Sequence, residues 1–482
     1  MRDVPTIFAL SSAPGRAGVA VIRVSGPAAG TVIELMAGKR KPKPRLAAGR
    51  SFIHPRTAEP LDRGIVIWFP EPKSFTGEDV AELHVHGGRA VVKAMLAALA
   101  EIPGCRSAEP GEFARRAFDH GKIDLAEVEG LADLIDADTE GQRRQALGQA
   151  LGRLSGLYDG WRASLVEAQS LVEATIDFAD EADISADAMA RARATVETLR
   201  LSMRRHLDDG HRGEILRSGF RIVLAGPPNA GKSTLLNALA RREAAIVSDE
   251  AGTTRDCLEV HLDLGGLPVI LTDTAGIREA EGKVEQEGIR RTFQRAREAD
   301  LILWLGASDS GETALPDDLR GHADKVLSVL TKSDLLDHEQ LAAEFPPPLR
   351  GEARGGGRRS GGDRTWDGGP QPTAPPPLPD DMVAISARTG AGMDDLTHRL
   401  AAIAAERVGH AGEEPVITQE RHRRLVEASV TSLDAFMDGD DALVELRAED
   451  LRRAADSLGR ITGRIGVEEV LGEIFSKFCL GK

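Results

Sequence analysis

The sequence predicts a multidomain α/β protein with three parts: an N-terminal α+β domain, a helical domain made of two separate stretches, and an α/β domain inserted between them. Short apolar runs typical of strands alternate with a helical pattern over the first ~120 residues. Helical periodicity fills residues 122 to about 216 and returns from about 415. Between these stretches, a β-branched run leads into a glycine-rich turn and then another helical pattern. A length of 482 residues fits about three domains of roughly 150 residues each.

The composition excludes several classes of protein. Subtracting 76 acidic from 61 basic residues gives a net charge of −15, which disfavours non-specific nucleic-acid binding by the whole surface. A local basic patch at "RHRRL", 421–425, stays open. The three cysteines follow no disulfide or metal-ligand spacing, and no run of about 18 apolar residues is long enough to span a membrane. We therefore expect a cytoplasmic protein with reduced thiols and no membrane contact.

The N-terminal domain is predicted from four strand-like runs and a helical pattern at 89–101. His84 and His86 are two residues apart, on one face of the last run, as metal ligands can be. No third ligand is evident, so we expect a structural role for both. The four runs are "TIFAL", "GVAVIRVS", "GIVIWF" and "DVAELHVH".

Two apolar stripes predict the helical domain. The first follows Asp124 and Glu127, a pair typical of a helix start, and the second lies near the end of the chain. Each stripe must bury its face against another element. One domain built from both stretches is the simplest interpretation, and two separate helical pieces are the alternative. The stripes are Leu125, Val128, Leu131, Leu134 and Ile135, then Val467, Val470, Leu471, Ile474, Phe475 and Phe478.

The strongest motif is "RIVLAGPPNAGKSTLLNAL", 221–239, where a strand pattern, a glycine-rich turn and a helix pattern follow one another. It contains G-x-x-x-x-G-K-S, the P-loop pattern, whose backbone N–H groups face phosphates. Lys232 is expected to reach the β- and γ-phosphate oxygens, and the Ser233 hydroxyl to ligate Mg²⁺.

Four further motifs follow the P-loop in the order found in GTPases. "GTTRD" supplies Thr254 as a switch hydroxyl for Mg²⁺, and "VILTDTAG" supplies Asp273 on the metal side and Gly276 as a γ-phosphate sensor. "LSVLTKSD" ends in Asp334, whose carboxylate accepts two guanine N–H donors, and "VAISARTG", 383–390, supplies backbone contacts to the base oxygen. The predicted GTP-binding residues are Asn229, Ala230, Gly231, Lys232, Ser233, Thr234, Ser248, Asp249, Glu250, Ala251, Gly252, Thr253, Thr254, Asp273, Thr274, Ala275, Gly276, Thr331, Lys332, Asp334, Ser386, Ala387 and Arg388.

Two positions depart from the usual GTPase pattern. The base-reading motif begins with Thr331 where Asn is usual, and a hydroxyl cannot replace every bond of a carboxamide, which predicts a lower guanine affinity. Ile277 stands where Ras-like proteins have the Gln that orients the catalytic water. A carboxylate in the following segment is the natural substitute, although a solvated switch face explains these residues equally well. The candidates are Glu279, Glu281, Glu285 and Glu287.

With these motifs the chain resembles the MnmE (TrmE) family of tRNA-modifying GTPases from end to end. The central motifs that carry the resemblance are "GPPNAGKS", "GTTRD" and "DTAGIRE". The flanking motifs are "APGRAGVAVIRVSG", "SFTGEDVAELHVHGG", "PGEFARRAF", "KIDLAEVEGLADLIDA" and the terminal "IFSKFCLGK".

The resemblance implies a set of site residues. Potassium takes the place of an arginine finger, and Glu285 is the catalytic glutamate. A tetrahydrofolate one-carbon donor, 5-formyl-tetrahydrofolate or a related form, binds the N-terminal domain. The implied ligands are Ser233 and Thr254 for Mg²⁺, Asn229, Ser248, Glu250 and Thr253 for K⁺, and Arg23, Glu82, Lys122 and Lys482 for folate.

The resemblance also implies the organisation of the chain. Residues 1–121 form an α+β domain that binds folate and dimerises. The helical domain consists of 122–217 and 408–482, and a Ras-like P-loop GTPase domain occupies 218–407. Within the last, the Pro- and Gly-rich segment 345–381 is expected to be a disordered loop. The implied partners are a second copy, tRNA and a FAD-dependent MnmG (GidA) protein in a heterotetrameric complex. GTP hydrolysis then drives a conformational change during C5 carboxymethylaminomethyl modification of the wobble uridine (position 34) of certain tRNAs.

Two alternatives to this function are a ribosome-assembly GTPase and a regulatory GTPase that only senses folate. The net charge and the N-terminal motifs argue against the first.

Cys479 has three interpretations. "CLGK" lacks the aliphatic residues that prenylation requires, which disfavours lipid attachment. A buried, inert cysteine and, by resemblance, a catalytic nucleophile in tRNA modification stay open.

Overall fold

The computed structural model divides into two units, each made of segments that are separate in the sequence. The first comprises Met1–Asp136, Gln145–Gly210 and Pro415–Lys482, and the second Ala137–Arg144 and His211–Glu414. The structure describes residues 4–38, 40–177, 182–209, 211–242, 244–246, 259–273, 299–309, 315–316, 319, 321, 323–336, 382–409, 415–440, 443–465, 471–472, 474–475, 478 and 481.

The predicted fold class is confirmed, because an α+β part, helices from both ends of the chain and an inserted α/β part are all present. The sequence predicts three domains, whereas the structure divides into two units, so the predicted limits between domains stay a prediction. None of the described helices is long and apolar enough to cross a membrane.

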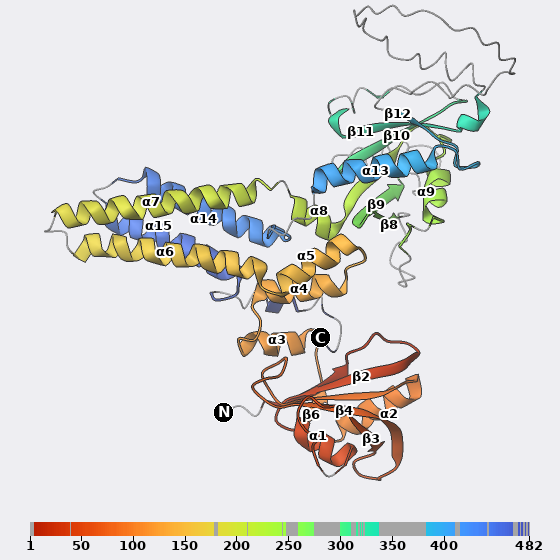
Figure 1. Ribbon diagram of the computed structural model, residues 1–482, viewed down its shortest axis with the longest axis vertical. Helices are drawn as coiled ribbons and strands as arrows, with labels where there is room; N and C mark the ends of the chain where they lie inside the picture. Colours follow the sequence, from red (N-terminus) through yellow and green to blue (C-terminus); the bar gives the residue numbers. More distant parts are fainter. Residues whose placement is uncertain are drawn as a thin grey trace, which may run out of the picture. The chain divides into compact units, whose positions relative to one another are not determined.

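The N-terminal part of the first unit is a six-stranded sheet with its helices (Figure 1). The strand order is β3-β4-β5-β2-β1-β6, antiparallel except for the β1–β6 pair. The strands are β1 (Thr6–Leu10), β2 (Ala17–Ser25), β3 (Ala48–Ile53), β4 (Pro60–Phe69), β5 (Val80–Gly87) and β6 (Cys105–Ser107); the helices are α1 (Ala29–Met36), α2 (Arg89–Ala100) and α3 (Glu112–Asp119).

Alternation along β2 explains the two faces of this sheet. Ile22 and Val24 are fully buried in the core with residues of α1 and α2. Arg23 therefore points to the opposite face, where its strand partner in β5 is Glu82. The sheet thus has one apolar face against its helices and one face that carries charge.

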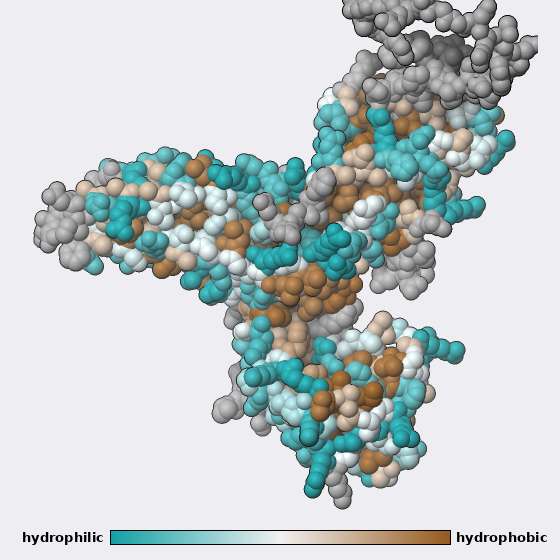
Figure 2. All heavy atoms as spheres, viewed as in Figure 1, coloured by the Kyte–Doolittle hydropathy of each residue, from teal (hydrophilic) through white to brown (hydrophobic). Residues whose placement is uncertain are grey.

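Helices from both ends of the chain complete the first unit. The long helices α6 (Arg153–Asp177), α7 (Ala182–Leu207), α14 (Glu420–Asp438) and α15 (Val444–Ile461) lie side by side in a bundle with one apolar core (Figure 1). This confirms one helical domain built from two stretches. The outer face of the bundle is mostly hydrophilic in the view of Figure 2.

The shorter helix α4 (Leu125–Ile135) starts with the predicted cap. Asp124 accepts a hydrogen bond from the Glu127 backbone N–H, and Glu127 accepts one from the Asp124 N–H. Leu125 and Val128 pack with buried residues of the C-terminal stripe, namely Leu471, Phe475 and Phe478. Ile135 is instead 40% exposed, so the predicted stripe is wrong at that end. Helix α5 (Glu140–Ala150) follows and is divided between the two units.

The buried face of α4 also carries a charge that sequence reasoning missed. Glu129 is 6% exposed, and its carboxylate lies 2.7 Å from His422 Nε2 and 3.0 Å from Arg421 Nη2. His422 and Arg423 are themselves buried. The possible basic surface patch at 421–425 is therefore wrong for these two residues, because they face the interior of the protein.

The second unit contains a six-stranded sheet in the order β12-β11-β10-β7-β9-β8, with only β8 antiparallel to its neighbour. Parallel strands end at the same edge, so the loops that follow them lie together there. The elements are β7 (Phe220–Ala225), β8 (Glu259–Leu264), β9 (Leu267–Asp273), β10 (Leu301–Ala307), β11 (Val326–Thr331), β12 (Met382–Ala384), α8 (Arg212–Ser218), α9 (Lys232–Ala240), α13 (Met393–Val408) and 3₁₀ turns at Ala323–Lys325 and Ser333–Leu335.

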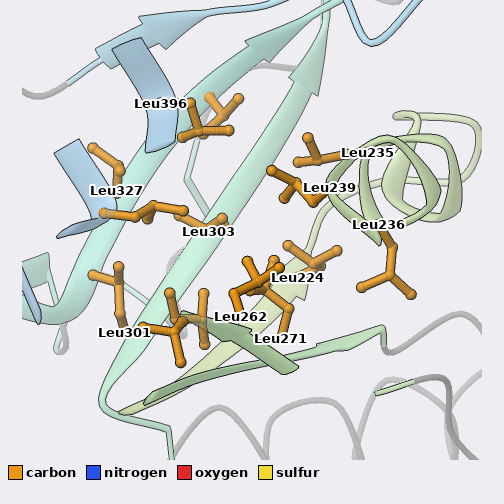
Figure 3. Close-up of a cluster of buried hydrophobic side chains, with 14 of the residues drawn as sticks. Leu224, Leu235, Leu236, Leu239, Leu262, Leu271, Leu301, Leu303, Leu327 and Leu396 are labelled. Carbon is orange, nitrogen blue, oxygen red and sulfur yellow. The ribbon is translucent and has the colours of Figure 1, made fainter. Parts of the chain in front are cut away.

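The core of the second unit fixes the strand that precedes the P-loop. Leu224 of β7 and Leu303 of β10 come from the sheet, and Leu235 and Leu396 come from the helices on it (Figure 3). All four are fully buried. Strand β7 and helix α9 are thereby held on a common core, so the turn between them is supported at both ends.

Candidate functional site

The P-loop is the turn between β7 and α9, and its backbone requires particular residues. Gly226 has φ 152°, and a β carbon there would lie 2.4 Å from the Leu305 carbonyl oxygen of β10. Asn229 adopts φ 61°, a left-handed conformation that Asn tolerates better than most residues. Only glycine therefore allows β7 to turn this close to β10.

Lys232 begins α9 and folds back over this turn. Its ammonium donates to the carbonyl oxygens of Gly226 at 2.8 Å and Pro227 at 2.9 Å. Burial lowers the pKa of Lys232 from its ordinary value, and the attraction of Asp273 opposes that shift. A cation and the N–H groups of a helix start lie together here, which is the arrangement that binds phosphates.

Ser233 and Asp273 meet beside the P-loop. The Ser233 hydroxyl donates to Asp273 Oδ2 at 2.7 Å, and Asp273 is 1% exposed at the end of β9. Both are oxygen donors of the kind that Mg²⁺ prefers, so these residues fit that ion. No group of three or more His, Cys, Asp or Glu side chains suited to a metal occurs among the described residues.

The base-reading loop follows β11. Asp334 Oδ1 accepts a hydrogen bond from Ser386 Oγ at 2.6 Å, and this bond holds the pKa of Asp334 below its usual range. Lys332, with φ 57°, forms an ion pair with Asp309 at 2.8 Å. A carboxylate kept ionised in this way is an acceptor for the paired N–H donors of guanine.

Thr331 connects the base-reading loop to the P-loop. Its hydroxyl donates to the Ala230 carbonyl oxygen at 2.7 Å and lies 3.2 Å from that of Gly306 in β10. The side chain is 5% exposed, and its single proton is committed to these carbonyls. Thr331 therefore holds the loop in place and has no donor left for a base.

The structure brings together three of the predicted groups of GTP-binding residues. Asn229, Ala230, Gly231, Lys232, Ser233 and Thr234 form the P-loop and the first turn of α9, while Thr331, Lys332 and Asp334 lie beside Ser386, with Ala387 and Arg388 next in the chain. The remaining candidates lie outside the described residues: Ser248, Asp249, Glu250, Ala251, Gly252, Thr253, Thr254, Thr274, Ala275, Gly276, Glu285, Cys479 and Lys482.

The first unit has a pocket on the charged face of its sheet, with a volume of about 370 Å³. It contains three predicted folate ligands, Arg23, Glu82 and Lys122. Arg23 pairs with Glu82 at 3.2 Å, and its guanidinium carbon lies 5.5 Å from the centre of the Phe75 ring. Sequence analysis did not assign the other lining residues to a site; they are Arg45, Phe69, Pro72, Lys73, Ser74, Phe75 and Val80.

The two histidines near this pocket have separate partners. His84 Nε2 lies 3.3 Å from Glu82, and His86 Nδ1 lies 2.8 Å from Asp62. These pairings agree with a structural role for both residues.

The chain end lies against the N-terminal part of the first unit. Ser11 Oγ donates to the Gly481 carbonyl oxygen at 2.8 Å, and Phe478 is buried. Gly481 also packs against the Leu10 backbone, where a β carbon would lie 2.1 Å from a carbonyl oxygen.

We predict that Thr331→Val weakens nucleotide binding. The substitution keeps the shape but leaves buried carbonyls without a donor, a loss of roughly 1–3 kcal/mol. GDP affinity, measured by fluorescence titration, should fall roughly tenfold. Thr397→Val is the control, because among the described residues the Thr397 hydroxyl bonds only to the Met393 carbonyl of its own helix. Unchanged GDP affinity in Thr331→Val would show that the loop does not need this bond.

Comparisons with known proteins agree with these features. The family model of the MnmE helical domain matches residues 125–479, and that of the GTP-binding protein TrmE N-terminus matches residues 6–122. Three similar proteins are each named tRNA modification GTPase MnmE. That of Parvibaculum lavamentivorans is 51% identical and covers 99% of this chain and 100% of its own.

The other two relatives are equally complete. The protein of Paramagnetospirillum magneticum is 48% identical and covers 99% of both chains, and that of Methylobacterium radiotolerans is 48% identical over 100% of both. With a P-loop, a guanine-type base loop and relatives of this identity over its full length, the chain belongs to the MnmE (TrmE) family of tRNA modification GTPases.

Proposed function

We propose that the chain is a potassium-dependent GTPase that takes part in C5 carboxymethylaminomethyl modification of the wobble uridine in certain tRNAs. The observation that carries this is the joint placement of the P-loop and a base loop ending in Asp334 within one sheet. Membership of the MnmE family supports tRNA modification as the process that hydrolysis serves.

In the proposed reaction, the P-loop and Lys232 bind the phosphates of GTP. Ser233 and Asp273, with Thr254, hold Mg²⁺, which when bound offsets charge on the β- and γ-phosphate oxygens. Glu285 orients the attacking water, because Ile277 can neither donate nor accept a hydrogen bond. Hydrolysis then drives a conformational change.

Potassium is proposed to stand where other GTPases place an arginine finger. Asn229 is an exposed residue of the P-loop, held by the left-handed backbone described above. With Ser248, Glu250 and Thr253 it supplies oxygen ligands for the ion. A monovalent cation beside the phosphates would offset negative charge that develops in the transition state.

The pocket of the first unit is proposed to bind 5-formyl-tetrahydrofolate or a related one-carbon donor. Its paired Arg23 and Glu82, with Lys122 nearby, supply donors and an acceptor beside the Phe75 ring, which suits a flat, polar, anionic ligand. Lys482 adds a cation, and Cys479 is the candidate nucleophile. The contact of Gly481 with Ser11 supports a place for the chain end near this domain.

The proposed assembly is a homodimer joined through the N-terminal domains 1–121. Ile65 of β4, opposite His84 on the charged face of the sheet, is 41% exposed, and Val19 of β2 is 57% exposed, which supports an interface at this sheet. The dimer joins a FAD-dependent MnmG (GidA) protein in a heterotetrameric complex in the cytoplasm. The helical domain consists of residues 122–217 and 408–482, and the GTPase domain of residues 218–407.

The direct test of this function is nucleoside analysis. In cells that lack the gene, mass spectrometry of digested total tRNA should show loss of the C5-substituted wobble uridine. Wild-type protein should restore it, and Lys232→Ala should not, because the phosphates lose their cation. An unchanged nucleoside profile in the deletion strain would contradict the proposed process.

We also predict that potassium accelerates GTP hydrolysis. Turnover should be at least roughly tenfold faster in KCl than in NaCl at equal ionic strength, because Na⁺ does not replace a K⁺ held by a fitted ligand set. Asn229→Ala should remove most of the difference, whereas exposed Thr57→Ala, in the other unit, should keep it. Equal rates of the wild-type protein in both salts would exclude the potassium role.

A further inference from the structure

The pocket of the first unit carries more positive charge than its own carboxylate can offset. Four cationic side chains line it, Arg23, Arg45, Lys73 and Lys122, together with one carboxylate, Glu82. Subtracting one from four leaves a formal excess of three positive charges. Within the part of the chain that the structure describes, only Arg23 of these cations forms an ion pair, and its partner is Glu82.

Arg45 is exposed, yet three contacts hold it at the pocket. Its backbone N–H donates to the Trp68 carbonyl oxygen at 2.8 Å, which fixes this loop to the end of β4. Its guanidinium carbon lies 5.5 Å from the centre of the Phe69 ring. The guanidinium also donates to the backbone carbonyl of Lys73. We call these two pocket-lining residues, joined by this hydrogen bond, the Arg45–Lys73 corner.

Lys122 lies against a different part of the loop that contains Lys73. It packs against Gly77, where a β carbon would lie 3.1 Å from Lys122 Cε. The pocket therefore has cations beside residue 73 and beside residue 77 of one loop, and the Phe75 ring comes between them in the sequence. A ligand with a flat ring system and several separate negative charges matches this distribution.

We propose that the Arg45–Lys73 corner binds the acidic tail of the pocket's ligand, so that the chain prefers ligands with several tail carboxylates. This rests on the proposed folate function of the same pocket. For a reduced folate the tail is the glutamate chain, and the preferred ligand is then the poly-γ-glutamate rather than the monoglutamate. Exposed ion pairs each contribute a few-fold at most, so two further carboxylates should increase affinity about tenfold.

The test is calorimetric titration of the full-length protein with the monoglutamate and triglutamate of 5-formyl-tetrahydrofolate. The wild-type protein should bind the triglutamate about tenfold more tightly, and Arg45→Gln with Lys73→Gln should reduce that ratio to about two or less. Lys43→Gln is the matched control. It removes an exposed cation two residues from Arg45 that does not line the pocket, and it should keep the ratio.

The outcomes separate the two proposals. Equal affinities of the wild-type protein for both ligands, or a ratio that survives the double substitution, overturn the tail site and leave the folate function standing. Binding of neither ligand overturns both. Monoglutamate affinity serves as the check on folding, because the double variant should retain it within a few-fold.

Discussion

The buried carboxylate of Glu129 is the constraint on which the first unit depends. It lies on α4, and its partners Arg421 and His422 lie on α14. His422 is 293 residues further along the chain than Glu129. Burial raises the pKa of Glu129, but attraction to His422 and Arg421 outweighs it and lowers the pKa to about 2. Breaking such a buried pair costs about 3–5 kcal/mol, because the remaining charge is left without a partner.

This pairing explains how two helical stretches stay in one domain although another domain is inserted between them in the sequence. The pKa of Glu129 is lower in the folded protein than in the unfolded chain, so its ionised carboxylate stabilises the folded state at pH values above the unfolded pKa. This stabilisation is lost as the pH falls through about 2. Glu129 is thus ionised at every working pH, and α4 and α14 stay joined. A further bond from Thr418 to Gln149, at 2.9 Å, ties the same two stretches together.

A smaller tether acts inside the second unit, where Thr331 fixes the base-reading loop to the P-loop carbonyl of Ala230. The residues proposed to contact phosphate and base are thereby joined at one edge of the sheet. The sequence identified Thr331 as a departure from the GTPase pattern. Its tethering role depends on the pairing of β10 with β11, which places Thr331 opposite Ala307 and next to Gly306. No local sequence pattern reveals this pairing.

Sequence reasoning predicted the features that depend on neighbouring residues and missed those that depend on residues far apart in the chain. The P-loop, the Asp124 cap and the strand of β2 are local, so their patterns predicted them. Arg45 and Lys73 come from loops without a recognisable motif, and only the folded sheet brings them to the pocket. The partners of Glu129 are equally remote, and the segment that contains them looked like a basic surface.

The central claim is that the second unit hydrolyses guanine nucleotides. The most direct measurement is kcat/KM of the purified full-length protein for GTP and ATP, side by side in KCl with Mg²⁺. Because Asp334 accepts hydrogen bonds that adenine cannot donate at that edge, GTP should be preferred by roughly a hundredfold or more. Similar values for the two nucleotides would contradict the account.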